Sequence, residues 1–134
     1  MDPTKINLIA VLVAALSSFV MGGIWYSPLL FAKPWMKDTG LTEDVLAQGN
    51  TAKILGGAFV LAVVIALNLA FFLGADAGWL WGLTAGALAG VGWVAASMGT
   101  TFLFERKPLR LILIDTGYHA ATYALMGAII GAWQ

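Results

Sequence analysis

Four long apolar stretches dominate the sequence, and each is about as long as the ~20 residues that a helix needs to cross a lipid bilayer. They cover residues 5–30, 51–73, 78–104 and 109–133. Sixty per cent of the 134 residues are hydrophobic and ten per cent are charged, whereas soluble domains average about 25% charged residues. The sequence therefore predicts an all-α integral membrane four-helix bundle that forms a single transmembrane domain over residues 1–134.

Composition argues against several function classes. The seven lysines and arginines are balanced by seven acidic residues, so the chain lacks the positive excess that nucleic-acid binding requires. It contains no cysteine, which excludes disulfides, thiolate metal sites and cysteine nucleophiles. The glycine-rich segment "GLTAGALAG" lies inside an apolar span rather than after a strand, so it is not a phosphate loop. We expect no enzymatic activity, no cofactor and no nucleic-acid partner, and membrane lipids as the surroundings.

The positive charges fall mostly on one side of the four spans. The side of the first and third loops carries Lys33, Lys37, Lys53, Arg106, Lys107 and Arg110, and the opposite side carries Lys5. Short loops rich in lysine and arginine stay in the cytoplasm. The pattern predicts a cytoplasmic loop at 31–50, with both termini and the turn at 74–78 on the outer side (N-out/C-out).

The segment "WYSPLLFAKPWM" ends the first span at residues 25–36. The amphipathic rings of Trp25, Tyr26 and Trp35 favour the depth of the lipid headgroups, and Pro28 bends or ends the helix. We interpret the segment as an interfacial anchor, with a ligand-binding motif as the alternative.

One short helix is predicted within the cytoplasmic loop. The stretch "LTEDVLAQGN" offers Thr42 as an N-cap, acidic residues in the first turn, and Gly49 with Asn50 as a stop. We expect this helix to lie on the membrane surface.

Three segments resemble a known bacterial family. They are "GGIWYSPLLFAKPWM", "LFERKPLRLILIDTGYH" and "MGAIIGAW". Together they resemble the domain of unknown function 1761 (DUF1761) family of small bacterial integral membrane proteins, and the likeness covers nearly the whole chain. The resemblance implies a four-helix protein of the bacterial cytoplasmic (inner) membrane without an established activity, and it supplies no catalytic residues.

The last span carries two ionisable residues, Asp115 and His119, on one helical face. Placing an ionisable residue in hydrocarbon costs at least ~2.5 kcal/mol, so we expect Asp115 and His119 to have a structural or functional role. Depth matching between neighbouring helices adds further members to this predicted polar seam: Ser97, Trp93, Asn68, Thr122, Tyr123 and Ser18. The seam is either a hydrogen-bond clasp that fixes packing or a path for protons or a small polar solute. We expect no metal, because one carboxylate and one imidazole leave an ion short of ligands.

Glycines recur on the last two spans at intervals that favour close helix packing. They are Gly78, Gly82, Gly86 and Gly90 on the third span, and Gly127 and Gly131 on the fourth. Such a row forms a groove for another helix, and the sequence leaves open whether that helix belongs to the same chain or to a second copy. We expect a homo-oligomer with a structural or accessory role. A small transporter or channel of unknown substrate is the alternative.

Overall fold

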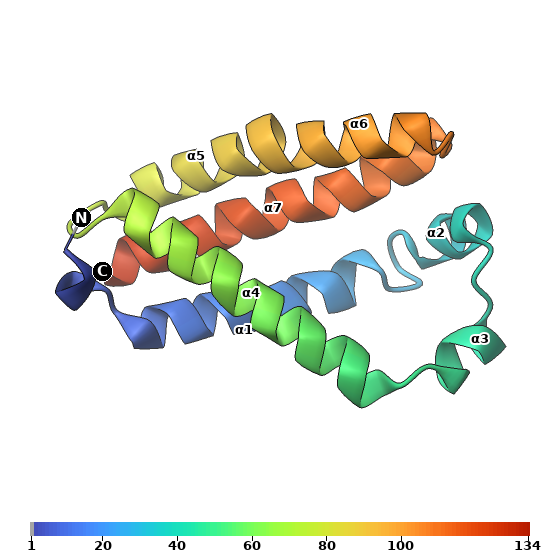
Figure 1. The fold of residues 1–134 in the computed structure, drawn as a ribbon, viewed down its shortest axis with the longest axis horizontal. Coiled ribbons are helices and arrows are strands. Elements are labelled where there is room, and N and C mark those ends of the chain that lie inside the picture. The colour runs from blue at the N-terminus through green and yellow to red at the C-terminus, as the bar shows by residue number, and fades with distance from the viewer. Residues whose placement is uncertain (1) are drawn as a thin grey trace.

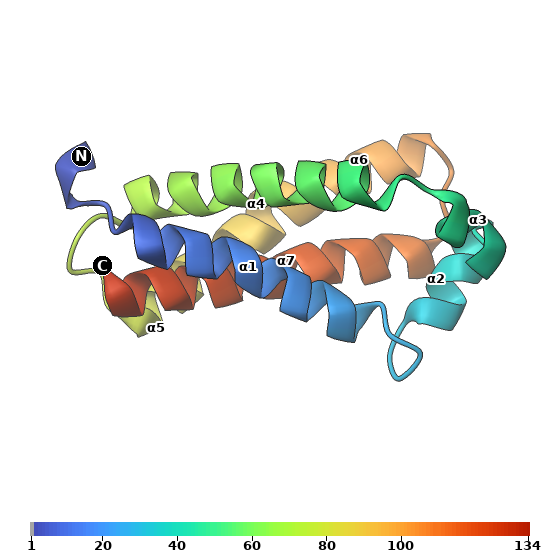
Figure 2. The same ribbon diagram turned by 90° about the horizontal axis from the view of Figure 1, so that it is seen from below.

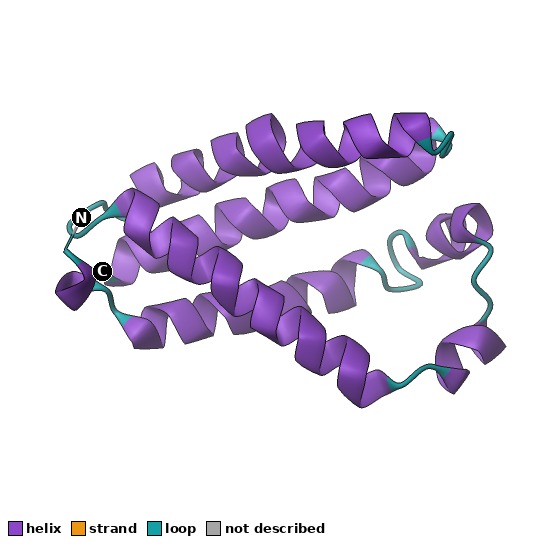
Figure 3. Ribbon diagram, in the orientation of Figure 1, coloured by secondary structure: helices purple, strands orange, loops and turns teal. Residues whose placement is uncertain are grey.

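The computed structural model describes residues 2–134, and within that range every regular element is a helix (Figures 1 and 3). Four rods run the length of the molecule. They are α1 (Leu8–Trp25), α4 (Thr51–Leu73), α7 (Leu109–Trp133) and a composite rod of α5 (Trp79–Ala89), the π-helical turn η2 (Gly90–Ala95) and α6 (Ala96–Phe104). The shorter elements are the 3-10 turn η1 (Pro3–Lys5), α2 (Ala32–Thr39) and α3 (Glu43–Gln48). The predicted all-α class is confirmed.

Within residues 2–134, three helices are long and apolar enough to cross a membrane, over Leu8–Trp25, Thr51–Leu73 and Trp79–Phe104. Their outward faces carry large apolar side chains, such as Val20 (63% exposed), Leu61 (64%) and Leu88 (64%). The fourth predicted span, α7, forms over the predicted residues 109–133 but is not one of these three. Its middle carries Asp115, His119 and several hydroxyl groups, which lower its hydropathy.

The helix α7 is the central element of the fold. It packs along α5 and η2, and it also contacts α1, α4, α2 and α6. Small residues allow this close packing: the buried core includes Ala14 and Ala15 of α1 and Ala66 of α4. The larger Met126 and Ile130 of α7 belong to the same core. The other three rods therefore surround α7, which is the least apolar of the four. Most polar side chains of α7 consequently lie at contacts with neighbouring helices.

The two ends of the molecule differ. Both termini and the α4–α5 turn lie at one end, and α2, α3 and the α6–α7 turn lie at the other (Figures 1 and 2). At the terminal end, the Asn7 side-chain amide donates to the Trp133 carbonyl (2.9 Å). The Gln134 amide donates to the carbonyls of Ala70 (3.0 Å) and Gly74 (2.8 Å). These bonds fasten the last residues of α7 to the start of α1 and the end of α4.

The prediction that the first helix continues to residue 30 is wrong. α1 ends at Trp25, because Pro28 has no N–H to continue the helix and disfavours helical geometry at Ser27. The chain instead turns, with the Phe31 N–H donating to the Trp25 carbonyl (3.1 Å). A second helix, α2, then begins at Ala32 and was not predicted. Pro34 lies in its first turn, where a missing N–H costs nothing.

The short helix predicted after Thr42 is present as α3. The Thr42 hydroxyl accepts a hydrogen bond from the Val45 N–H (3.3 Å), and Glu43 and Asp44 occupy the first turn. An N-cap and early acidic residues are the features that favour a helix start.

Candidate functional site

Two segments far apart in the sequence meet where α1 ends beside the first turns of α7. The Trp25 indole Nε1–H donates to the Ile114 carbonyl (2.9 Å). The Tyr26 hydroxyl donates to Asp115 Oδ1 (2.8 Å). Because α1 and α7 are antiparallel, the last residues of α1 are level with the first third of α7. Asp115 therefore has its hydrogen-bond partner directly after the end of α1, in the segment predicted to anchor the chain in the interface.

Aromatic rings surround this bond. The Tyr26 ring lies 5.4 Å, between ring centroids, from both Trp35 and Tyr118. The Tyr118 hydroxyl donates to the Ser18 carbonyl (3.0 Å), which adds a further bond between α7 and α1. We call the group of Trp25, Tyr26, Trp35, Asp115 and Tyr118 the clasp.

A glycine on α7 lets the clasp close. A Cβ built on Gly117 would lie 3.0 Å from Cζ2 of the Trp25 indole, which is tighter than an ordinary van der Waals contact. Any side chain at position 117 would therefore push the indole outward. The absence of a side chain at Gly117 lets the Trp25 indole pack directly against the α7 backbone.

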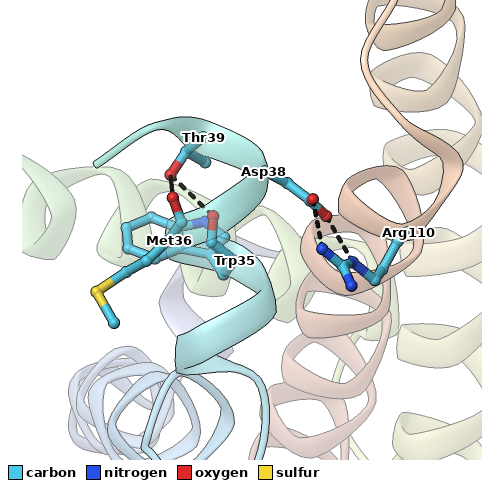
Figure 4. A network of polar contacts seen from close by, with 5 residues as sticks. All are labelled: Trp35, Met36, Asp38, Thr39 and Arg110. Carbon is cyan, nitrogen blue, oxygen red and sulfur yellow. Dashed lines mark hydrogen bonds and ion pairs between the residues drawn. The ribbon is translucent and has the colours of Figure 1, made fainter. Parts of the chain in front are cut away.

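An ion pair holds α2 against α7 beside the clasp (Figure 4). The Arg110 guanidinium donates twice to Asp38, from Nε to Oδ2 (2.8 Å) and from Nη2 to Oδ1 (2.6 Å). The Asp38 side chain is 10% exposed and that of Arg110 is 51% exposed. The bond from Arg110 lowers the pKa of Asp38 below its usual value, so Asp38 is ionised at neutral pH. This two-point contact positions α2, and with it the Trp35 ring beside Tyr26.

Two residues of the predicted seam lie elsewhere. Ser97 is exposed, and Trp93 is 64% exposed and packs edge-on against Phe72 of α4. In a regular α-helix, Ser97 would share the face of Gly86 and Gly90 that meets α7. The π turn η2 effectively adds one residue, which rotates the following face by about 100°. Gly99 now faces Ile112 of α7 instead, and the predicted match of Ser97 and Trp93 with Asp115 and His119 does not occur.

The other predicted seam residues line two cavities. Ser18, His119, Thr122 and Tyr123 share a cavity of about 250 Å³ between α1, α4 and α7. Asn68, Trp93 and Tyr123 line a second cavity of about 380 Å³ between α4, the α5–η2–α6 rod and α7. There the Asn68 amide donates to the Val64 carbonyl of its own helix (2.8 Å). The predicted continuous seam is thus divided: Asp115 lies in the clasp, Ser97 is exposed, and the remaining groups line the two cavities.

The cavity beside His119 contains an unsatisfied polar atom. Thr122 is 3% exposed, and its buried hydroxyl has no hydrogen-bond partner among residues 2–134. His119 is half-buried, with its ring edge-on to Tyr118 at a centroid distance of 5.0 Å. No group of three metal-ligating side chains occurs within the same described residues. We call this space the His119 cavity. Its polar atoms are single hydrogen-bonding groups rather than a ligand set for a metal ion.

The glycine groove on α5 is occupied by α7 of the same chain. A Cβ built on Gly82 would overlap the Gly127 carbonyl oxygen, and one on Gly86 would overlap that of Tyr123. A Cβ on Gly90 would lie 2.8 Å from the Ala120 Cα. On the other side of the contact, Gly131 packs against the Gly78 carbonyl in the same way. Of the two arrangements left open by the sequence, the structure uses this row for packing within one chain.

The family model described as "Protein of unknown function (DUF1761)" matches residues 9–131. Both segments that form the clasp lie within this match. No curated protein and no solved structure matches the chain.

Proposed function

We propose that this chain, which belongs to the DUF1761 family of proteins of unknown function, is a multi-pass protein of the bacterial inner membrane with a structural or accessory role and no enzymatic activity. The clasp is the observation that carries the proposal. The Asp115 side chain accepts a hydrogen bond from Tyr26, the residue that follows α1, so packing accounts for an acid in a membrane helix. A polar contact between membrane helices contributes about 0.6–2 kcal/mol.

The arrangement of the rods supports a bundle of four membrane-crossing helices. Three of them are apolar enough to face lipid, and they pack around α7. Ionisable residues within membrane helices almost always face the interior of a bundle. A fourth membrane span as polar as α7 has to lie inside the bundle, and α7 does occupy the central position.

The distribution of positive charge supports an N-out/C-out orientation. One end of the molecule carries α2, α3 and the α6–α7 turn (Figure 1). The cations on these elements or on the helix ends beside them are Lys33, Lys37, Lys53, Arg106, Lys107 and Arg110. Cytoplasmic loops are enriched in such residues. We place α2 and α3 on the cytoplasmic membrane surface.

Labelling of single cysteines tests this orientation, because the natural chain has none. Ala75→Cys in the α4–α5 turn should react with a membrane-impermeant maleimide added to intact spheroplasts. The matched variant Ala47→Cys in α3 should react only after permeabilisation. Both alanines are exposed, so their accessibility differs only through the membrane. The reverse labelling pattern would contradict the orientation, and labelling of both before permeabilisation would contradict the membrane placement.

We also propose that copies of the chain associate through α4. Residues 51–58 of this helix are exposed, and a Cβ on Gly56 or Gly57 would meet nothing within 4 Å. Small residues allow another helix to approach closely in a membrane. The glycine row on α5 is already filled, whereas this second flat surface on α4 is open to a neighbouring subunit.

Transport is the second candidate function, and the His119 cavity favours it. Histidine exchanges protons near neutral pH, and this histidine lines a cavity together with two hydroxyl-bearing residues, Ser18 and Thr122. Under the structural role, vesicles containing the protein should show no more proton flux across a pH gradient than empty vesicles. His119→Leu should not change that result. A flux that depends on the protein and is abolished by His119→Leu would replace the structural role with transport.

A further inference from the structure

We propose that the His119 cavity binds a neutral, lipid-soluble carbonyl compound of the size of a quinone ring. The inference goes beyond a structural role, and it rests on the proposed membrane placement because the ligand would arrive from the lipid. It concerns binding alone and requires no electron transfer.

The size of the cavity fits one substituted ring. Its volume is about 250 Å³, and a cavity of about 150 Å³ in another protein holds benzene. Most of the wall is apolar and includes Phe19 of α1, Ile65 of α4 and Met126 of α7. On α4 the small residues Ala58 and Ala62 leave the space open. A flat ring with short substituents would fill this volume against apolar surfaces on three helices.

The polar groups that line the cavity favour a ligand that is neutral and accepts hydrogen bonds. The Thr122 hydroxyl is buried without a partner, and such an unmade bond costs about 1–3 kcal/mol. A carbonyl oxygen in the cavity would accept from this hydroxyl, and His119 and Tyr123 supply further donors in the same wall. None of the residues lining the cavity is acidic, and none is a lysine or arginine. An ion would therefore lack a counter-charge there, whereas a ketone or quinone needs none.

The ligand can enter sideways from the bilayer. In Figure 1, α4 and α7 diverge toward the end that carries α3. Leu61, which lines the cavity, is 64% exposed on the outer face of α4. The cavity thus reaches the lipid-facing surface beside Leu61. A ring could occupy it while an attached alkyl tail stays among the lipid chains.

Methyl resonances of methionine provide a direct test. The chain has five methionines, and Met126, which is 1% exposed, lines the cavity. Protein labelled with ¹³C at the methionine methyl groups should be titrated with decylubiquinone in lipid nanodiscs. We expect a saturable shift of the Met126 signal. Thr122→Val should weaken the binding about three- to tenfold, the effect of losing one hydrogen bond, and Thr122→Ser should restore it.

The matched control is Thr116→Val. Thr116 is also buried on α7, but its hydroxyl donates to the Ile112 carbonyl and it lies outside the cavity. This variant should bind decylubiquinone as the natural chain does. Equal loss of affinity in the Thr116→Val and Thr122→Val variants would overturn the proposal.

The unaltered protein supplies a second test. Decylbenzene has the same tail without carbonyl groups, and it should bind at least about tenfold more weakly than decylubiquinone. Equal shifts with both compounds would mean that the carbonyl groups do not contribute to binding. No shift with either compound would mean that the cavity does not admit a ligand. Each of these results overturns the proposal. The cysteine labelling of positions 47 and 75 is independent of them, so the membrane placement can stand if the ligand site fails.

Discussion

Replacing Gly86 with alanine should destabilise the bundle by about 3 kcal/mol, at the upper end of the usual cost of overpacking. The added methyl group would overlap the Tyr123 carbonyl oxygen. Backbone cannot move aside as a flexible side chain can, so α5 and α7 must separate along their length. Near-ultraviolet circular dichroism during thermal unfolding in detergent checks this, because Trp79 and Trp81 on α5 report on the packing of that helix.

Gly56→Ala is the control for this substitution. It makes the same chemical change in a membrane helix, but the new methyl group would meet nothing within 4 Å in the same chain. The unfolding temperature should therefore stay near that of the natural protein. If α4 forms the subunit contact, light scattering should give the natural protein a molecular mass above that of one chain. Equal stability of Gly86→Ala and Gly56→Ala would contradict the glycine contact, and a natural protein with the 14.1 kDa mass of one chain would contradict the oligomer.

Tyr26→Phe should cost about 2 kcal/mol, because it leaves the Asp115 carboxylate without the hydrogen bond that the structure provides. Hydrogen bonds to charged groups contribute about 1.5–3 kcal/mol, whereas those between neutral groups contribute about 1 kcal/mol. The free energy of unfolding measured in mixed detergent micelles gives the value. The loss should shrink in the Asp115→Leu background, since both partners are then absent.

Tyr118→Phe provides the comparison. It removes a hydroxyl of the same kind, which donates to a neutral carbonyl of Ser18 (3.0 Å), and its cost should be about 1 kcal/mol. A Tyr26→Phe loss no larger than that of Tyr118→Phe would contradict the larger contribution expected of the Tyr26–Asp115 bond. Asp115→Asn keeps an acceptor for Tyr26, and it should preserve the folded bundle.

Much of the fold is predictable from the sequence, because apolar length and capping residues are local signals. The helices at 51–73 and 109–133 have the predicted bounds, and Thr42 begins α3. The end of the first helix and the presence of α2 were missed. Apolar character continues past Trp25 through Leu29 and Leu30, and it conceals the turn that Ser27 and Pro28 impose. Hydropathy alone therefore reads the turn as part of the span.

The candidate site was predicted less well, because it depends on which helix faces meet. Asp115 and His119 were recognised as unusual, but depth matching gives only a position along the axis and not a direction around it. The π turn in the third rod then rotated Ser97 away from α7. One signal could have identified Tyr26: the last residues of the first helix must be level with the first turns of an antiparallel last helix, which contain Asp115.

The contact between α5 and α7 also determines how the molecule can move. Backbone atoms form it, at Gly82 against Gly127 and at Gly86 against Tyr123, so neither helix can turn about its own axis without collision. The pair must behave as a rigid body. On α4, by contrast, Ala66 and Ala70 are fully buried while residues 51–58 are exposed. We therefore expect any motion of α4 against this pair to pivot about its second half, and the contact of its first half with a neighbouring subunit to restrict that motion.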